Sequence, residues 1–190
     1  MEKNINSSFD ELTSLISKNK KYLNEKINDI LKLFFNTIKK NRTIFWAGNG
    51  GSAAESQHMS AELIGRFKFN RKPVSSIALS ADISSTTAIS NDYGFENIFS
   101  RQLDGLGRAG DLLIVMSTSG NSKNIIKVLK VAKSKGIKSI AFLGNDGGKC
   151  KSYSDLSLII KSKNTARIQE MHQIISHIIC ENVENQMLND

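Results

Sequence analysis

The sequence is poor in the residues that mark secreted, membrane-spanning or tail-like proteins. It contains two cysteines and one proline among 190 residues. Cys150 and Cys180 provide no disulfide framework, so we expect a reduced, cytoplasmic protein. No apolar run reaches the ~18–20 residues of a membrane span. The N-terminal segment carries charges where a signal peptide has an apolar core, so we expect neither a membrane partner nor a signal peptide.

Acidic residues are outnumbered, with 18 Asp and Glu against 26 Lys and Arg and a formal net charge of +8. A basic surface attracts nucleic acid by releasing counterions. Here the lysines occur in short clusters without interleaved aromatic residues, and no nucleic-acid-reading module is recognisable. The pattern favours scattered, solvated lysines and no nucleic-acid partner. A small phosphorylated substrate suits the positive charge equally well.

The hydrophobic pattern divides the chain into a helical N-terminal segment, residues 1–42, and an alternating remainder. Apolar residues at helical spacing over 8–40 predict one long amphipathic helix or two joined helices, long enough to pack against another subunit. Short apolar runs then alternate with helical stretches, which predicts an α/β fold with a doubly wound, five-stranded parallel sheet between two helical layers, in a single domain over 1–190. The expected strands are 43–47, 74–80, 112–117, 138–143 and 156–161, and the expected helices are 52–67, 94–107, 121–135, 146–153 and 165–188.

Ligands of such sheets bind beyond the carboxyl ends of the strands, and two loops at these positions carry distinctive residues. The first is Gly48-Asn49-Gly50-Gly51-Ser52, whose glycines permit a sharp turn and a close approach to a ligand. We expect Ser52 to cap the following helix, whose N-terminus favours an anion. The alternative is that these glycines serve only a tight turn between a strand and a helix, which needs glycine without any ligand. The absence of a phosphate-loop lysine argues against an NTPase.

The second loop is Ser117-Thr118-Ser119-Gly120-Asn121-Ser122. Its four hydroxyl groups, together with backbone N–H groups at a helix start, predict a phosphate-binding cradle. The alternative is a turn stabilised by serine side chains with a helix cap, which uses only one or two hydroxyls.

Two helices carry further candidates. His58 and Glu62 are four residues apart, so they share one helix face and form either a metal or proton-transfer site or a surface pair. At about 100° per residue, Gln169 can share a face with His172 or with His177, but the two histidines lie about 140° apart. His172 is nearer the apolar stripe, so His177 is the better functional candidate.

The segment from Ser90 to Phe95 is expected to be a polar loop before a helix. Asp92 in this loop would either orient a substrate hydroxyl or cap that helix.

Four strings carry a family resemblance: GNGGSAAESQHMSAELIGRF, AISNDYGFENIFSRQL, STSGNS and TARIQEMHQIISHIICE. In order and spacing they resemble the bacterial phosphoheptose isomerases, over about residues 8 to 188. These enzymes belong to the sugar-isomerase (SIS) class of α/β sandwiches. The resemblance implies interconversion of sedoheptulose 7-phosphate and D-glycero-D-manno-heptose 7-phosphate through an enediol, on the route to the heptose of lipopolysaccharide core or surface polysaccharide.

The resemblance also implies roles for individual residues. One zinc ion per subunit would be bound by His58, Glu62, Gln169 and His177, with Glu62 as general base and His177 as general acid. Some relatives have an aspartate where this chain has Ala166. Family members are homotetramers with sites at subunit interfaces. The residues implied to bind substrate are Asn49, Gly50, Gly51, Ser52, His58, Glu62, Asn91, Asp92, Ser117, Thr118, Ser119, Ser122 and Gln169.

Two other functions remain open on the sequence. One is a non-catalytic SIS adaptor that binds the replication-initiator protein, and the other is an isomerase of another phosphosugar. The chain retains Glu62, His177 and Ser119, which the adaptor branch lacks or alters, so the isomerase is favoured.

Overall fold

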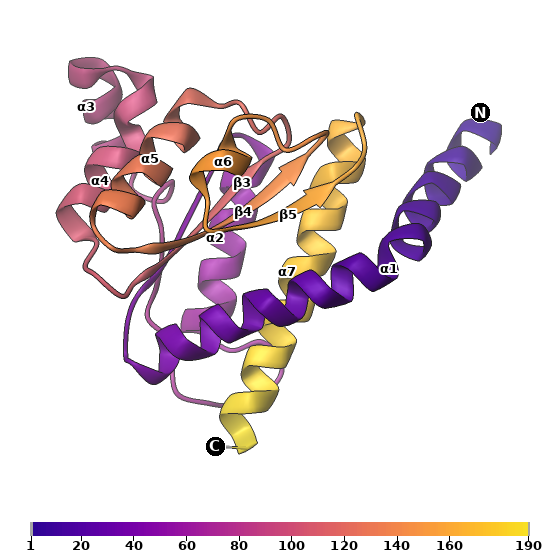
Figure 1. Ribbon diagram of the computed structural model, residues 1–190, viewed down its shortest axis with the longest axis horizontal. Coiled ribbons are helices and arrows are strands. Elements are labelled where there is room, and N and C mark those ends of the chain that lie inside the picture. Colours follow the sequence, from indigo (N-terminus) through magenta and orange to yellow (C-terminus); the bar gives the residue numbers. More distant parts are fainter. Residues whose placement is uncertain (1, 190) are drawn as a thin grey trace.

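The centre of the molecule is a five-stranded sheet, seen in the computed structural model, which describes residues 2–189 (Figure 1). All strand pairs are parallel, in the order β2-β1-β3-β4-β5. The prediction of a doubly wound parallel sheet is confirmed. The strands are β1 (Ile44–Gly48), β2 (Ser76–Ala78), β3 (Leu112–Ser117), β4 (Lys138–Gly144) and β5 (Leu156–Ile160).

Helices cover both faces of the sheet. Helices α1 (Glu2–Lys39), α2 (Gly51–Ile64) and α7 (Thr165–Asn189) cover one face, and α4 (Ile98–Leu106), α5 (Lys123–Ser134) and α6 (Cys150–Tyr153) cover the other (Figure 1). Along β3, Ile114 and Met116 join the first core and Leu113 and Val115 join the second. Because both faces of the strand are buried, its sequence is a continuous apolar run rather than an alternating one.

Helix α1 is one continuous helix, which settles the choice between one helix and two. Its C-terminal half packs on the sheet and against α7 through residues such as Ile30 and Phe34, neither of which is exposed. Its N-terminal part extends past the rest of the chain (Figure 1). There Phe9 is 67% exposed. Among the described residues, no helix is both long and apolar enough to cross a membrane.

The main departure from the predicted elements is α3 (Ile83–Tyr93). The expected polar loop at 90–95 was wrong, because Ser90 to Tyr93 form the last turn of this helix. No residue of α3 is buried, so the helix lacks the apolar periodicity by which the others were found. The helix expected over 94–107 is a 3₁₀ turn, η1 (Phe95–Asn97), followed by α4.

The strand order reverses direction at β1, because β2 lies on one side of β1 and β3 on the other. A crevice forms at such a switch point beyond the carboxyl ends of the two central strands. The glycine loop follows β1 and the serine loop follows β3, so the topology brings both to this crevice.

Packing between loops gives a stability prediction for Gly120. Its φ is +65°, and a Cβ there would overlap the carbonyl oxygen of Gly147 in the loop after β4. Gly136 also has a positive φ, +68°, but a Cβ added there would meet only the Cβ of Ala109, at an ordinary contact distance of 3.6 Å. We expect Gly136→Ala to lower the free energy of unfolding by about 1 kcal/mol, the cost of a left-handed backbone. Gly120→Ala should cost at least about 1 kcal/mol more, the scale of a core overlap. Urea unfolding followed by circular dichroism measures both, and equal losses would contradict the proposed loop packing.

Candidate active site

The glycine loop turns through a conformation that only glycine adopts easily. Gly50 precedes α2 with φ +55° and ψ −123°, and it forms no side-chain cap. The prediction that Ser52 caps this helix was wrong, because Ser52 is the second residue of α2 and is 5% exposed. The loop nevertheless presents a helix N-terminus without a side-chain cap, where backbone N–H groups favour an anion.

An amide pair joins the glycine loop to the first turn of α5, which directly follows the serine loop. The Asn49 Nδ2 donates to Asn124 Oδ1 at 3.0 Å, and Asn124 Nδ2 donates to Asn49 Oδ1 at 2.8 Å. Asn124 is 2% exposed and was missed by sequence reasoning. The signal was present, because a buried asparagine opens the otherwise apolar face of α5. This reciprocal pair sets the distance between the two loops.

The serine loop is partly held by its own hydroxyl groups. Ser117 Oγ accepts from the Gly120 N–H and lies 3.2 Å from Ser122 Oγ, and Ser119 Oγ accepts from the Asn121 N–H. Ser122 precedes α5 but its side chain does not cap it. A turn stabilised by serines therefore accounts for Ser117 and Ser119, while Ser122 lines a hollow of about 300 Å³ together with Asn49 and Lys123.

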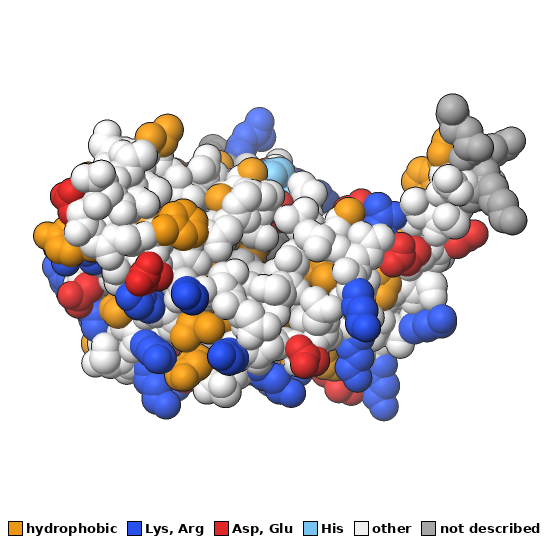
Figure 2. Space-filling view, turned by 90° about the horizontal axis from the view of Figure 1, so that it is seen from above, with side chains coloured by type: hydrophobic (Ala, Val, Ile, Leu, Met, Phe, Trp, Pro, Cys, Tyr) orange, Lys and Arg blue, Asp and Glu red, His pale blue; other side chains and the backbone are white. Residues whose placement is uncertain are grey.

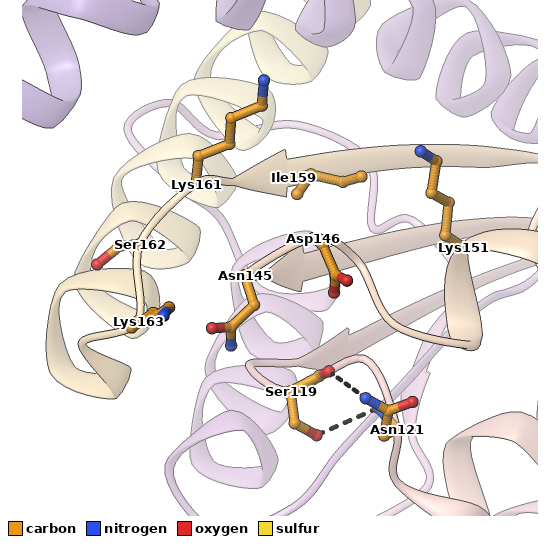
Figure 3. Close-up of a pocket in the computed structure, with 9 residues that line it drawn as sticks. All are labelled: Ser119, Asn121, Asn145, Asp146, Lys151, Ile159, Lys161, Ser162 and Lys163. Atoms are coloured by element: carbon orange, nitrogen blue, oxygen red, sulfur yellow. Dashed lines mark hydrogen bonds between the residues drawn. The ribbon is translucent and has the colours of Figure 1, made fainter.

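A larger hollow, about 790 Å³, opens on the other side of the serine loop (Figure 3). Ser119 and Asn121 line it from this loop, and Lys151, Lys161 and Lys163 contribute positive charge. Lysines therefore border the serine loop on both sides, with Asp146 in the larger hollow and Glu96 in the smaller one. The excess of positive charge in the larger hollow suits an anionic ligand.

Below the glycine loop, three ionisable side chains converge. His58 and Glu62 of α2 and His177 of α7 have ligand atoms that all lie within 4.8 Å of one another. His58 Nε2 is 3.1 Å from Glu62 Oε1, and the rings of His58 and His177 are 5.1 Å apart in an edge-on arrangement. A carboxylate from one helix and an imidazole from another therefore meet.

His172 occupies a different environment. It is 1% exposed, packs against Phe142 and donates from Nε2 to the carbonyl oxygen of Leu143 at 3.3 Å. Burial lowers the pKa of His172 to about 4, although that hydrogen bond opposes the shift. The imidazole is neutral at pH 7, and the interpretation of His172 as a packed residue is supported.

Gln169 lies apart from the three-residue cluster within one chain. A Cβ on Gly51 would approach Gln169 Nε2 to 2.8 Å, so this side chain lies against the glycine loop. Gln169 and His177 are eight residues apart on α7, a separation of about 12 Å along the helix axis. One chain alone therefore does not bring all four expected metal ligands together.

Asn91 and Asp92 lie on the exposed last turns of α3, and Asn91 Nδ2 donates to Asp92 Oδ1. The alternative that Asp92 caps the following helix was wrong, because Gly94 precedes η1 and Asn97 precedes α4. Asp82 caps α3 instead, accepting from the Ser85 N–H at 3.0 Å. Neither Asn91 nor Asp92 lines the hollows beside the glycine and serine loops.

A buried ion pair that sequence reasoning missed connects α2 to α7. Glu184 of α7 is 1% exposed and accepts from the backbone N–H groups of residues 67–69, which follow α2. Arg71 Nε lies 3.4 Å from Glu184 Oε1, and its Nη atoms donate to the carbonyl oxygens of Glu62 and Leu63. The guanidinium thus joins the carboxyl end of α2 to α7.

The loop held by Glu184 carries Phe67, whose ring stacks on His177 at 5.7 Å with an interplanar angle of 29°. The Arg71–Glu184 pair and this stacking together fix the imidazole of His177 relative to Glu62. Sequence patterns do not show this contact, because Phe67 and His177 are 110 positions apart in the chain.

The buried pair gives a prediction for stability and its pH dependence. Burial alone raises the pKa of Glu184, but three backbone N–H groups and Arg71 outweigh it, so the pKa is lowered. Its stabilisation is therefore present above the unfolded-state pKa of about 4.3 and is lost as pH falls through the folded-state value. We expect Glu184→Gln to lower the free energy of unfolding by about 3 kcal/mol at pH 7, with the difference shrinking in acid.

The matched control is Glu181→Gln, one turn earlier on α7, where a 41%-exposed carboxylate pairs with Lys68. It should cost about 0–1 kcal/mol. Urea titrations between pH 3 and pH 7 measure both variants. A Glu184→Gln loss no larger than that of the control would show that the buried pair does not hold the loop.

Comparison with known proteins agrees with this geometry. The profile of the SIS domain family matches residues 8–144. The phosphoheptose isomerase of Sulfurimonas denitrificans is 46% identical over 190 residues, covering 100% of this chain and 96% of the relative. Solved phosphoheptose isomerases from Neisseria gonorrhoeae and Francisella tularensis superpose with TM-scores of 0.92 and 0.93 at 37% and 32% identity. They cover 97% and 96% of this chain, and 98% and 97% of theirs. The chain therefore belongs to the SIS domain family and, within it, to the phosphoheptose isomerases.

Proposed function

We propose that the chain interconverts sedoheptulose 7-phosphate and D-glycero-D-manno-heptose 7-phosphate. The observation that carries the proposal is the convergence of Glu62 and His177 on two helices that also flank the glycine loop. An adaptor has no need of a carboxylate and an imidazole held in this way. The relatives named above are isomerases of the same substrate class, which supports the assignment.

Substrate binding follows from the placement of donors. The serine loop, with Ser117, Thr118, Ser119 and Ser122, and the N-terminus of α2 offer hydroxyl and backbone N–H donors to the phosphate. Asn49, Gly50, Gly51 and Ser52 border the same crevice. The sugar then extends past Gln169 toward a cluster of His58, Glu62 and His177. Because Gln169 lies against the glycine loop and about 12 Å along α7 from His177 of its own chain, that cluster would belong to a neighbouring subunit.

The chemistry is a proton transfer between adjacent carbons. The Glu62 carboxylate removes the proton from the carbon next to the carbonyl group, and a ring N–H of His177 gives a proton to the carbonyl oxygen, which gives an enediol. Glu62 then returns its proton to the neighbouring carbon while the other hydroxyl gives its proton to His177. The base and the acid end as they began, so one pair serves both directions.

The cluster also has the donor set of a catalytic zinc site. Two imidazoles and one carboxylate are usual zinc ligands. We propose one zinc ion per subunit, held by His58, Glu62 and His177. Bound zinc would supply positive charge that stabilises the developing enediolate oxygen. Because Gln169 of the same chain lies about 12 Å along α7 from His177, a fourth ligand of this type would be Gln169 of the partner subunit.

Surface features support a homotetramer. No residue of α3 is buried, and Ile83, Tyr93 and Phe95 in and after it are more than half exposed. The protruding N-terminal part of α1 carries Phe9 and Ile5, which are also exposed. We propose that residues 1–190 form one SIS domain, that the segment 1–42 joins subunits, and that Asn91 and Asp92 contact the sugar hydroxyls of a neighbouring site.

We further propose that the enzyme works in the cytoplasm and supplies heptose for lipopolysaccharide core or surface polysaccharide. A nucleic-acid partner is not part of the proposal. Figure 2 shows Lys and Arg side chains mainly in the lower half of the visible face, with Asp and Glu side chains among them. Such a distribution does not favour a polyanion over a small phosphorylated sugar.

The test of the proposed function is conversion of sedoheptulose 7-phosphate by the purified protein, followed by NMR of the aldose product. We expect Glu62→Gln to lower kcat by about 10²–10⁴-fold, the usual contribution of a general base, while substrate affinity stays within a few-fold. The control is Glu25→Gln, an exposed glutamate on α1, which should keep wild-type turnover. Turnover of Glu62→Gln close to wild type would show that the base is another group.

The zinc proposal has its own measurement. Competition with a chromophoric chelator should show one zinc ion per chain, and His58→Gln and His177→Gln should each weaken zinc affinity at least about tenfold, as loss of a ligand requires. Gln57→Ala, the exposed neighbour of His58, should bind zinc like wild type. Equal affinity in all four proteins would exclude the cluster as the metal site.

A further inference from the structure

The larger hollow, about 790 Å³, is formed by the serine loop and the segments that follow β4 and β5 (Figure 3). Its volume lies within the range of about 300–1,000 Å³ that is usual for small-molecule sites. Ser119 is the one lining residue to which the proposed function gives a role. Asn49, Gly51 and Gln169 line the hollows next to the glycine loop and do not line this one. The larger hollow therefore offers space for a second ligand, outside the catalytic crevice.

Hydrogen bonds between neighbouring loops hold the walls of the larger hollow. Asn145 donates from its backbone N–H to the carbonyl oxygen of Ser162 and from Nδ2 to that of Thr118, each at 3.1 Å. The backbone N–H of Lys149 donates to Asn121 Oδ1, also at 3.1 Å. Because these walls are already ordered, a ligand that binds between them pays little for ordering loops.

Three lysines give the larger hollow its positive charge. The Nζ groups of Lys151, Lys161 and Lys163 form no ion pair or hydrogen bond with any residue that the structure describes. Asp146 is the one carboxylate that lines the hollow, and its Oδ1 accepts from the Gly148 N–H at 3.0 Å. Unpaired lysines are common on protein surfaces, but here three of them border one concave site. In such a site charges of one sign add up and attract a counter-ion.

The lysines reach the hollow from two sides. Lys151 belongs to α6, whereas Lys161 and Lys163 follow β5, and the side chain of Ile159 lies between Lys151 and Lys161 (Figure 3). Each ammonium group can form a charge-assisted hydrogen bond to a phosphate oxygen. A ligand with one phosphate group would meet the lysines of one side. A ligand with a phosphate group at each end can meet both sides while its carbon chain lies over Ile159.

We propose that the larger hollow binds a small sugar bisphosphate. One phosphate group would contact Lys151, and the other would contact Lys161 and Lys163. The ligand class differs from that of the catalytic crevice, where the serine loop and the N-terminus of α2 serve a single phosphate group. The proposal does not depend on the reaction proposed above, because it uses the charge and shape of the hollow alone.

Calorimetric titration with fructose 1,6-bisphosphate tests the site. Replacing Lys161 and Lys163 together by Gln should weaken binding at least about tenfold, the effect of losing hydrogen bonds between charged groups. Lys151→Gln, at the other end of the hollow, should weaken it to a similar extent. The matched control replaces the exposed Lys39 and Lys40 by Gln, which removes the same charge at the end of α1. It should bind within about twofold of wild type.

A second probe tests the need for two phosphate groups. Glucose 6-phosphate should bind the wild-type protein at least about tenfold more weakly than fructose 1,6-bisphosphate, because it can meet the lysines of one side only. Equal affinity for the two probes overturns the proposal, as does a wild-type protein that does not bind the bisphosphate. An equal loss in the control variant would assign binding to net charge and overturns it as well.

Turnover of sedoheptulose 7-phosphate separates the larger hollow from the catalytic crevice. The Lys151 variant and the Lys161 and Lys163 variant should both keep kcat and KM within about twofold of wild type. A rise in KM that matches the loss of bisphosphate affinity would show that these lysines serve the substrate itself, which contradicts a second site.

Discussion

The candidate site depends on one buried carboxylate. Glu184 holds the backbone of residues 67–69 against α7, and its partner Arg71 holds the last carbonyl groups of α2. Glu62 is on α2 and His177 is on α7, so the pair sets the separation of the two proposed catalytic groups. A buried ion pair adds little net stability over an apolar contact of equal shape, but it accepts only one arrangement of its hydrogen bonds. Its contribution here is the fixed geometry of the site.

Most of the fold was predictable because the strands are buried on both faces. Continuous apolar runs such as 112–117 are visible without knowledge of any partner strand, and the helices between them show apolar periodicity. Helix α3 was not predictable in this way, since none of its residues is fully buried and, among them, only Ile89 packs against the core. The N-cap of α2 was predicted at Ser52 because serine is a common capping residue. In the structure Gly50, whose φ is positive, occupies the N-cap position.

In the candidate site, too, contacts within one helix were predictable and contacts between distant segments were not. The pairing of His58 with Glu62, and the preference for His177 over His172, followed from positions on single helices. The Glu184 carboxylate and the Asn49–Asn124 amide pair escaped notice, because their partners are 75 or more positions away in the sequence. Helical periodicity shows which face a residue occupies and carries no information on which element packs against that face. Gln169 illustrates this limit, since the resemblance to phosphoheptose isomerases grouped it with His177 and the structure places it beside Gly51.

The polar groups along α2 differ in kind between its start and its end. At its N-terminus, backbone N–H groups and the nearby serine hydroxyls donate, which suits a phosphate. Two turns later His58, Glu62 and His177 can both give and take a proton, which suits a carbonyl group and its neighbouring carbon. Gly51 and Glu62 are eleven residues apart, about 16 Å along the axis of α2, which is longer than the carbon chain of a heptose. The proposed homotetramer resolves this distance, because the Gln169 that would join a zinc cluster lies against the glycine loop of its own subunit. The phosphate-binding loops of one subunit would then face the base of its neighbour.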